Sequence, residues 1–364
     1  MERQTGTIPC MTDAVRPRTV AEVLEKRVKG QEDAVKELSI ALAKKLQGLT
    51  TGNTLMIGSS GTGKTTLMRA IEGWLADPEA PEQNWPLIRV HANVLAEDAS
   101  KDRPGEAILV RLLNRARESF GDLGTERLVE SAARGLVFID EIDKIRSHIG
   151  GQPNTAGIRA QEALLTLIEN EAVPMRLPDW AGGATITVDA SRLLFIAAGA
   201  FEGLYDAVYD RVTVGEDRGA LQTMSVFEEA GGVRQETHFA LRDWLQYQDL
   251  FDYGLTPQFL ARFDSLVLLD ALSEDVLVEI FLNDPESGLQ QAREYFSSLG
   301  VELAISPAAV RRIAQEAALQ PRLGARALKE VFRRIMRDLE FDPEATTGTA
   351  LMVDLPEVES ALDR

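Results

Sequence analysis

The chain has 364 residues, 45% hydrophobic and 26% charged, and its 39 Lys and Arg against 57 Asp and Glu give a net charge of −18. Its length suggests two domains, and its composition is typical of a soluble globular protein without the run of about 18 apolar residues that a membrane span needs. An acidic surface repels a polyphosphate backbone, which disfavours general DNA or RNA binding. We expect a cytoplasmic protein, because no N-terminal signal pattern appears.

Cysteine and histidine usage argues against metal or disulfide chemistry as an organising feature. Cys10 is the only cysteine, which excludes an intrachain disulfide and a zinc site built from several cysteines. His91, His148 and His238 are scattered without ligand spacing, so we interpret each as an ordinary packed or solvated side chain. Residues 1–18 are polar and lack hydrophobic periodicity, and we expect them to form a flexible N-terminal segment.

The segment Leu55–Thr66, LMIGSSGTGKTT, has the spacing G-x-x-x-x-G-K-[ST]. An apolar strand-like run precedes it and apolar residues at helical spacing follow it. This order of strand, glycine-rich loop and helix directs backbone N–H groups at a phosphate near the helix N-terminus. A glycine-rich turn that arose by chance does not explain such an order. We expect Lys64 to reach the β- and γ-phosphates and the Thr65 hydroxyl to bind Mg²⁺. The predicted nucleotide-binding residues of the loop are Ser60, Gly61, Thr62, Gly63, Lys64, Thr65 and Thr66.

A second apolar run, Leu136–Ile139, ends in two adjacent carboxylates. A continuous apolar run of this length is typical of a strand that is buried on both faces of a parallel sheet. At the carboxyl end of such a strand, Asp140 can hold the Mg²⁺ shell and Glu141 can orient and deprotonate the attacking water. Asp143 is the weaker candidate for the base, because a short turn separates it from the strand. Together with the phosphate loop, these residues predict hydrolysis of ATP or GTP.

Strands and helical patterns alternate along the first two thirds of the chain, which predicts an α/β domain with a mainly parallel sheet. Further strands are predicted at Leu87–His91, Leu193–Ala198 and Leu266–Leu269. From about Asp270 the pattern is helical. Ser273 is a predicted N-cap, and Ser306-Pro307 is predicted to begin another helix.

Several long motifs in a fixed order make the chain similar to the AAA+ ATPases, and within them to the ClpX/HslU unfoldase branch. The likeness covers roughly residues 19–341. Its motifs are Val28–Leu42, Gly135–Ile145, Glu162–Asn170, Val188–Phe201, Tyr253–Asp264 and Pro321–Phe332. The resemblance implies an AAA+ P-loop domain with a mainly parallel five-stranded sheet, followed by a small all-α lid domain. It also implies ATP and Mg²⁺ as ligands.

The resemblance divides the chain into four parts. We expect a flexible segment over 1–18, a large α/β ATPase domain over 19–269 with an insertion at 202–249, a helical lid over 270–345 and a C-terminal tail over 346–364.

The resemblance also assigns functional residues outside the loop. Val28, Gly30 and Gln31 would lie beside the adenine base. Arg262 would be the arginine finger, and Arg326 would be the sensor 2 arginine that reaches from the lid to the nucleotide. A guanidinium suits both roles, because it keeps its proton and can stabilise charge that spreads over the γ-phosphate oxygens. Since Arg262 would act in a neighbour's site, the resemblance implies a ring, of six subunits in this branch.

Several features depart from the unfoldases of this branch. The matching place for their aromatic pore loop, about Ala99–Asp102, contains a lysine and no aromatic residue. Their second pore loop carries a basic residue, whereas Gly150–Thr155 is neutral and is expected to be flexible. The insertion at 202–249 lacks the peptidase-docking Ile-Gly-Phe tripeptide, and we find no counterpart of the zinc-binding module of ClpX. Residues 194–199, which match the sensor 1 strand, offer no polar side chain, so turnover could be slow.

Two hypotheses from different classes follow. The first is an ATP-hydrolysing machine that remodels or disassembles a dedicated protein partner without a peptidase. The second is an ATP-controlled oligomeric switch or scaffold with slow turnover. A general unfoldase that feeds a Clp-type peptidase is disfavoured by the missing gripping and docking motifs, and a DNA-loading ATPase by the acidic charge. The ATP site is common to both leading hypotheses, so stimulation of hydrolysis by a partner is what distinguishes them.

Overall fold

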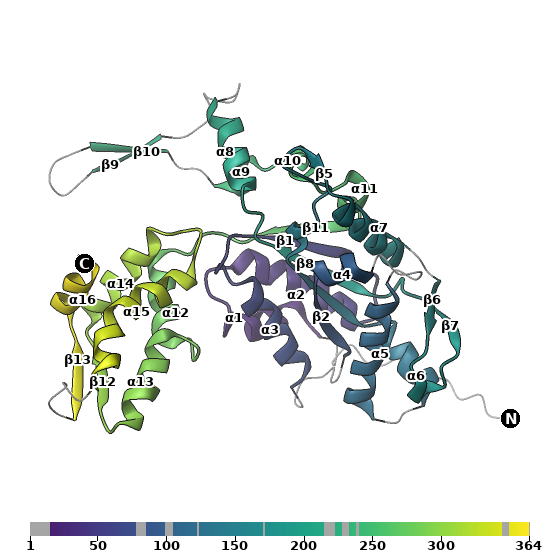
Figure 1. Cartoon of the computed structure of the whole chain (residues 1–364), viewed down its shortest axis with the longest axis horizontal. Coiled ribbons are helices and arrows are strands. Elements are labelled where there is room, and N and C mark those ends of the chain that lie inside the picture. The colour runs from purple at the N-terminus through teal and green to yellow at the C-terminus, as the bar shows by residue number, and fades with distance from the viewer. Residues whose placement is uncertain are drawn as a thin grey trace.

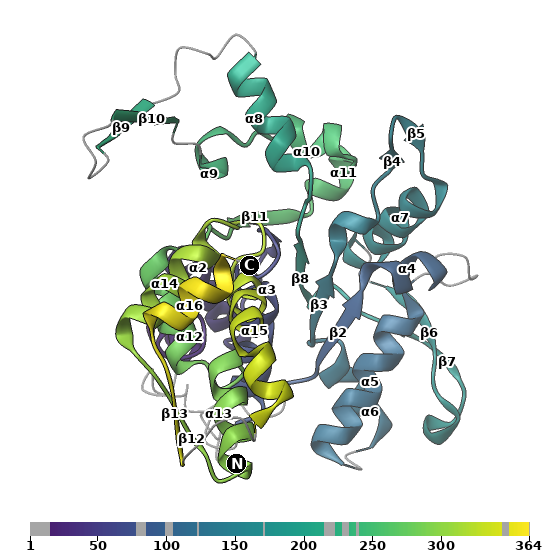
Figure 2. The same ribbon diagram turned by 60° about the vertical axis from the view of Figure 1, so that its left-hand side comes forward.

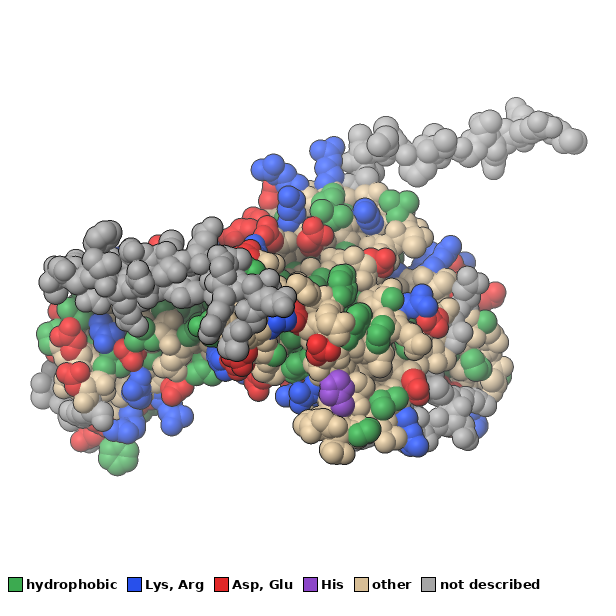
Figure 3. All heavy atoms as spheres, turned by 90° about the horizontal axis from the view of Figure 1, so that it is seen from above, with side chains coloured by type: hydrophobic (Ala, Val, Ile, Leu, Met, Phe, Trp, Pro, Cys, Tyr) green, Lys and Arg blue, Asp and Glu red, His purple; other side chains and the backbone are tan. Residues whose placement is uncertain are grey.

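The computed structural model describes residues 15–77, 85–98, 105–121, 124–169, 172–214, 223–227, 233–237, 240–343 and 349–363, with 96–98, 214, 223–227 and 233–237 described by their backbone. The chain forms a large unit built on a sheet and a smaller, mainly helical unit beside it (Figure 1). Among the described residues, no helix is both long enough and apolar enough to cross a membrane. Basic and acidic side chains are interspersed over the face shown in Figure 3.

The large unit contains a five-stranded sheet in the order β11-β1-β8-β3-β2. All neighbouring strands are parallel. The strands are β1 (Asn53–Ile57), β2 (Leu87–His91), β3 (Leu136–Asp140), β8 (Leu194–Gly199) and β11 (Phe263–Leu268). The predicted parallel α/β fold is therefore confirmed. β11 begins three residues before the predicted strand, because the polar Asp264 and Ser265 interrupt the apolar run at this edge of the sheet.

Helices cover both faces of the sheet, as its apolar strands require. Along β1 the side chains alternate, so that Leu55 faces one helical layer and Met56 the other. Met56 packs in the layer formed by α1 (Pro17–Glu25), α2 (Glu32–Leu46) and α3 (Lys64–Leu75). Leu55 packs in the layer that includes α4 (Ala92–Asp98), α5 (Glu106–Phe120), α6 (Thr125–Ala132) and α7 (Thr155–Glu169).

The start of the chain differs from the prediction of a flexible segment over 1–18. Residues 1–14 lie outside the described part of the chain. Pro17 already occupies the first turn of α1, where its fixed φ favours the helix. Val15 is 6% exposed and packs with the core of α1, α2 and α3. The ordered large unit therefore begins before the predicted boundary.

The small unit has a hydrophobic core of its own. Its helices are α12 (Glu274–Asn283), α13 (Gly288–Ser298), α14 (Pro307–Ala318), α15 (Ala325–Phe341) and α16 (Leu355–Leu362). Two of them begin at the predicted caps, because the Ser273 and Ser306 hydroxyls accept hydrogen bonds from the backbone N–H groups of Val276 and Ala309.

The small unit also contains strands, and the end of the described chain is part of it. β12 (Glu302–Ile305) and β13 (Ala350–Val353) pair in parallel. Val353 and Val358 are buried in the core of the unit. The prediction of a tail over 346–364 was therefore wrong for residues 349–363. Sequence patterns missed this part because each strand is only four residues long.

One part of the predicted insertion over 202–249 packs in the large unit, and another part extends away from it. Leu204, Val208 and Val212 of α8 (Leu204–Val214) are buried in the core of the large unit. β9 (Thr223–Phe227) and β10 (Val233–Thr237) then form an antiparallel hairpin that stands away from the body of the molecule (Figures 1 and 2). α9 (Leu241–Trp244), α10 (Tyr247–Tyr253) and α11 (Pro257–Leu260) lead back to β11.

Only the second of the two predicted pore loops lies within the described residues. The first, about Ala99–Asp102, lies outside the described residues. The second, Gly150–Thr155, was expected to be a flexible loop but belongs largely to a short antiparallel hairpin of β4 (His148–Ile149) and β5 (Gln152–Pro153). Its turn is formed by Gly150 and Gly151, which have φ angles of 58° and 76°. A second hairpin, β6 (Val173–Arg176) with β7 (Thr185–Val188), lies beside α5.

Candidate nucleotide site

The phosphate loop opens into a cavity of about 660 Å³ between the large and small units. The end of β3 contributes Asp140 and Glu141 to its wall, and α15 of the small unit contributes Arg326. The phosphate-loop residues that line the cavity are Ser60, Gly61, Gly63, Lys64, Thr65 and Thr66. The Thr62 side chain does not line it, because its hydroxyl donates to the Ser59 carbonyl oxygen within the loop.

Lys64 begins α3 and is folded back onto its own loop. Its ammonium donates to the carbonyl oxygens of Gly58 and of Ser59, the latter at 2.7 Å. Burial lowers the pKa of Lys64 to about 8, and the nearby carboxylates of Asp140 and Asp143 act in the opposite direction. A partly desolvated cation is therefore held at the cavity wall, where the negative charge of a triphosphate would stabilise it better than carbonyl oxygens do.

The two carboxylates at the end of β3 differ in burial. Asp140 is only 8% exposed and forms an ion pair with Arg89 of β2. Glu141 has a left-handed φ of 58°, which is uncommon for a residue other than glycine, and its N–H donates to Asp140 Oδ1 at 3.0 Å. About half of the Glu141 side chain is exposed, and its carboxylate lies 4.0 Å from His91 Nδ1. The turn thus buries one carboxylate and leaves the other accessible.

Asp143, the weaker candidate for the base, is already used in a structural contact. Its side chain is 2% exposed, and its Oδ1 accepts a hydrogen bond from the Ala200 N–H at 3.3 Å. Ala200 follows β8, whose residues are all buried and, as noted from the sequence, carry no polar side chain. Asp143 therefore joins the ends of β3 and β8, which leaves Glu141 as the accessible carboxylate of the two.

The phosphate loop directly contacts the turn before α15. The Ala325 N–H donates to the Gly61 carbonyl oxygen at 3.1 Å. A Cβ atom on Gly61 would lie 2.0 Å from the Leu323 carbonyl oxygen, and one on Gly324 would lie 2.6 Å from the Gly61 carbonyl oxygen. Both glycines also have positive φ angles, 72° and 51°. Only residues without a side chain allow this close approach of loop and lid.

Two arginines extend this contact between the units. The Arg326 guanidinium donates to the Ser60 hydroxyl of the phosphate loop. Arg69 of α3 pairs with Glu286 of the small unit at 2.9 Å, and both residues line the cavity. Sequence analysis missed Arg69 and Glu286, because neither belongs to a motif.

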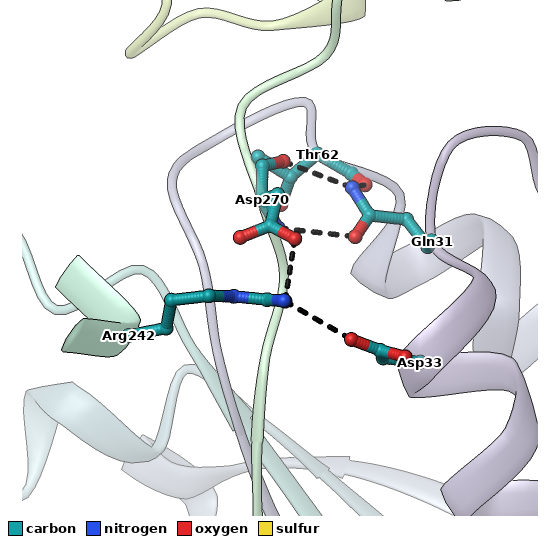
Figure 4. Close-up of polar contacts among 5 residues, drawn as sticks. All are labelled: Gln31, Asp33, Thr62, Arg242 and Asp270. Carbon is teal, nitrogen blue, oxygen red and sulfur yellow. Dashed lines mark hydrogen bonds and ion pairs between the residues drawn. The ribbon is translucent and has the colours of Figure 1, made fainter. Parts of the chain in front are cut away.

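Gln31 joins the phosphate loop to the connection between the two units. Its Nε2 donates to the carbonyl oxygens of Thr62 at 3.0 Å and Asp270 at 2.9 Å, and its Oε1 accepts from the Asp270 N–H at 3.1 Å (Figure 4). Arg242 of α9 bridges the Asp270 carboxylate, at 2.5 Å, and Asp33 of α2, at 3.0 Å (Figure 4). Both polar atoms of the Gln31 side-chain amide are therefore used in contacts with the phosphate loop and with Asp270.

The residues predicted to lie beside the adenine base do not line the cavity. Val28 and Gln31 are both 4% exposed. Gly30 lies against the small unit, where a Cβ atom would lie 2.9 Å from Val276 Cγ1. The three residues are next to the phosphate loop, and their contact with adenine stays a prediction.

Arg262 also lies outside the cavity of its own chain. It follows α11 directly before β11, and its guanidinium pairs with Glu169 at the end of α7. About half of the Arg262 side chain is exposed. The structure therefore brings Lys64, Thr65, Asp140, Glu141 and Arg326 together around one cavity and leaves Arg262 at a separate, accessible position.

Comparisons with known proteins identify the family of the chain. The sequence profile of the AAA domain (Cdc48 subfamily) matches residues 49–266, from just before β1 into β11. The chain is 31% identical to the ATP-dependent Clp protease ATP-binding subunit ClpX of Porphyromonas gingivalis, over 96% of this chain and 83% of that protein. It is 30% identical to ClpX 3 of Methylococcus capsulatus, over 94% and 80%, and 31% identical to ClpX of Bacteroides fragilis, over 90% and 77%.

Proposed function

Because the chain belongs to the AAA+ ATPases and is ClpX-like over most of its length, we propose that it uses ATP hydrolysis to remodel or disassemble one dedicated protein partner. The observation that carries the proposal is the cavity between the two units, which takes charged residues from both. A nucleotide in this cavity interacts with the large unit and the lid at once. Its binding and hydrolysis can therefore change the angle between them and perform mechanical work.

The residues around the cavity fit Mg²⁺ and ATP. Thr65 and Asp140 offer a hydroxyl and a buried carboxylate, which are the oxygen ligands that Mg²⁺ prefers. When bound, the ion would neutralise negative charge on the β- and γ-phosphates. Lys64 and Arg326 both contact oxygens of the phosphate loop, and phosphate oxygens can replace these contacts.

Glu141 is the proposed general base. Its carboxylate is accessible from the cavity, whereas Asp140 is paired with Arg89 and Asp143 is buried. A carboxylate at this place can orient a water molecule for attack on the γ-phosphate and accept its proton. Arg262 is proposed to act in the site of a neighbouring subunit, since its exposed guanidinium lies away from its own cavity. This role implies assembly into a ring, which we propose to be a hexamer.

The proposal of a dedicated partner is supported by the sequence of the two predicted pore loops. The first carries no aromatic residue over Ala99–Asp102, and the hairpin over His148–Pro153 carries no Lys or Arg. Force transfer to an arbitrary polypeptide needs bulky contacts in the pore. The relatives are named as ATP-binding subunits of a protease. For this chain we propose action without a peptidase, because 202–249 contains no Ile-Gly-Phe tripeptide.

A second candidate function is an ATP-controlled switch or scaffold with slow turnover. The observation that favours it is β8, whose buried residues offer no polar side chain beside Glu141 to help position water. In that case nucleotide binding would control assembly and partner binding, and hydrolysis would only reset the protein.

A partner captured with the hydrolysis-deficient Glu141→Gln protein tests the proposal. We expect the purified partner to raise the ATPase rate of the wild-type protein several-fold and to be disassembled or unfolded only when ATP is hydrolysed. The measurement is steady-state ATPase activity together with the assembly state of the partner by light scattering. A partner that binds in an ATP-dependent manner, without stimulating hydrolysis and without changing its own state, would support the switch instead.

A further inference from the structure

The buried carboxylate of Asp140 is held by a cation of its own chain. Arg89 Nη2 of β2 donates to Asp140 Oδ2, and the Glu141 N–H donates to Asp140 Oδ1. Both carboxylate oxygens are therefore engaged. β2 and β3 are parallel with His91 opposite Asp140, so Arg89 lies two residues earlier on the same face. The Arg89 and Asp140 side chains are 33% and 12% exposed, and both line the nucleotide cavity.

We propose that Arg89 competes with Mg²⁺ for Asp140, so that the metal binds this carboxylate only after displacing an internal ion pair. The inference rests on the proposed function, because it takes Asp140 as part of the Mg²⁺ shell. Arg89 cannot release the carboxylate by losing its proton, since a guanidinium stays charged at all relevant pH values. The Asp140 carboxylate is released when the Arg89 guanidinium binds another anionic partner.

A bound nucleotide would offer Arg89 such a partner, in addition to the carboxylates that already line the cavity. The other cations predicted to bind the nucleotide are also held by the protein itself, Lys64 by carbonyl oxygens of the phosphate loop and Arg326 by the Ser60 hydroxyl. A triphosphate adds negative charge to the cavity that Arg89 lines. We therefore infer that nucleotide favours release of Arg89 and thereby metal binding at Asp140. Nucleotide and metal then bind cooperatively, and metal alone binds weakly.

A purely structural role for the Arg89–Asp140 pair explains the position less well. β2 and β3 are already joined by a continuous parallel ladder from Leu87–Leu136 to His91–Asp140, so the strands need no additional link between side chains. The pair also faces the cavity instead of the interior of either helical layer. The Arg89–Asp140 pair is partly buried. We therefore expect its removal to change metal affinity more than removal of an exposed ion pair would, and less than removal of a fully buried one.

The test measures metal binding and not hydrolysis. Mn²⁺ replaces Mg²⁺, and electron paramagnetic resonance reports the free ion in titrations of the nucleotide-free protein. Arg89→Gln is expected to bind Mn²⁺ about tenfold more tightly than the wild type. Arg89→Lys keeps the charge but not the planar contact and is expected to bind about two- to threefold more tightly. Arg115→Gln, which removes an arginine paired with Glu118 on α5 outside the cavity, should match the wild type.

Unchanged or weaker Mn²⁺ binding by Arg89→Gln would overturn the inference. If this variant does not fold, Arg89→Lys decides, and wild-type Mn²⁺ affinity in that variant would overturn the inference equally. A fluorescent ATP analogue, added to the wild type in the presence of excess Mg²⁺, tests the nucleotide site separately. Absence of saturable binding there would contradict the proposed function itself. Normal nucleotide binding with no effect of Arg89 on the metal would contradict only the inference.

Discussion

Glu141→Gln is expected to bind ATP with nearly wild-type affinity and to hydrolyse it roughly 100-fold more slowly or worse. The substitution removes the proton acceptor but keeps the shape of the side chain. It leaves the buried Asp140 and the phosphate loop unchanged, because the Glu141 backbone N–H and not its carboxylate holds Asp140. The measurements are equilibrium binding of a fluorescent ATP analogue and steady-state phosphate release.

Two further variants test whether Glu141 itself is the base. Glu130→Gln, at a surface carboxylate of α6 that pairs with Arg134, serves as a control for loss of a charge and should hydrolyse ATP like the wild type. Near-normal turnover by Glu141→Gln would mean that another carboxylate is the base. In that event Asp143→Asn, made at the buried carboxylate that contacts Ala200, should show the large loss instead.

Arg262→Ala is expected to lower turnover by roughly 1000-fold if the guanidinium stabilises the transition state as an arginine finger. ATP binding should change little, because Arg262 does not line the cavity of its own chain. The substitution also frees Glu169, which is about 41% exposed and can be solvated, so folding should be preserved. Steady-state turnover at saturating ATP is the measurement.

A mixture of two inactive proteins tests whether Arg262 acts across a subunit interface. Lys64→Ala subunits lack the cation that reaches the phosphates but keep Arg262, whereas Arg262→Ala subunits keep an intact site. Mixed assemblies should therefore recover part of the activity, since an intact finger meets an intact site at some interfaces. Mixtures of Arg326→Ala and Lys64→Ala subunits should recover none, because each site then lacks its own Lys64 or its own Arg326, and both residues act on the nucleotide of the subunit that carries them. No recovery in an Arg262 mixture shown to co-assemble would place Arg262 outside a shared site.

The parts of the fold that follow from short sequence patterns were predicted correctly. β3 is a continuous apolar run, and α3 follows a glycine-rich loop with its apolar residues at helical spacing. Ser273 and Ser306 cap helices because a serine hydroxyl satisfies a free N–H of the first turn wherever the rest of the chain lies. Each of these features depends on about a dozen residues or fewer, which is why the sequence alone is sufficient.

The features that sequence analysis missed depend on contacts between distant residues. Gln31 and Asp270 are 239 positions apart, and Arg89 and Asp140 are 51 apart. No spacing rule connects such residues, so the contact between Gln31 and Asp270 was not predicted and Arg89 received no role. The pairing of β12 with β13 is a similar case, since it brings together two four-residue strands from either side of α14 and α15.

The claim that this ATPase serves a dedicated partner is tested most directly by unfolding of a stable fluorescent protein that carries several unrelated terminal tags. Fluorescence is followed with ATP and the wild-type protein, alone and together with a Clp-type peptidase, and Glu141→Gln serves as the hydrolysis-deficient control. We predict no ATP-dependent loss of fluorescence with any tag. ATP-dependent loss across several unrelated tags would contradict the claim and identify the protein as a general unfoldase.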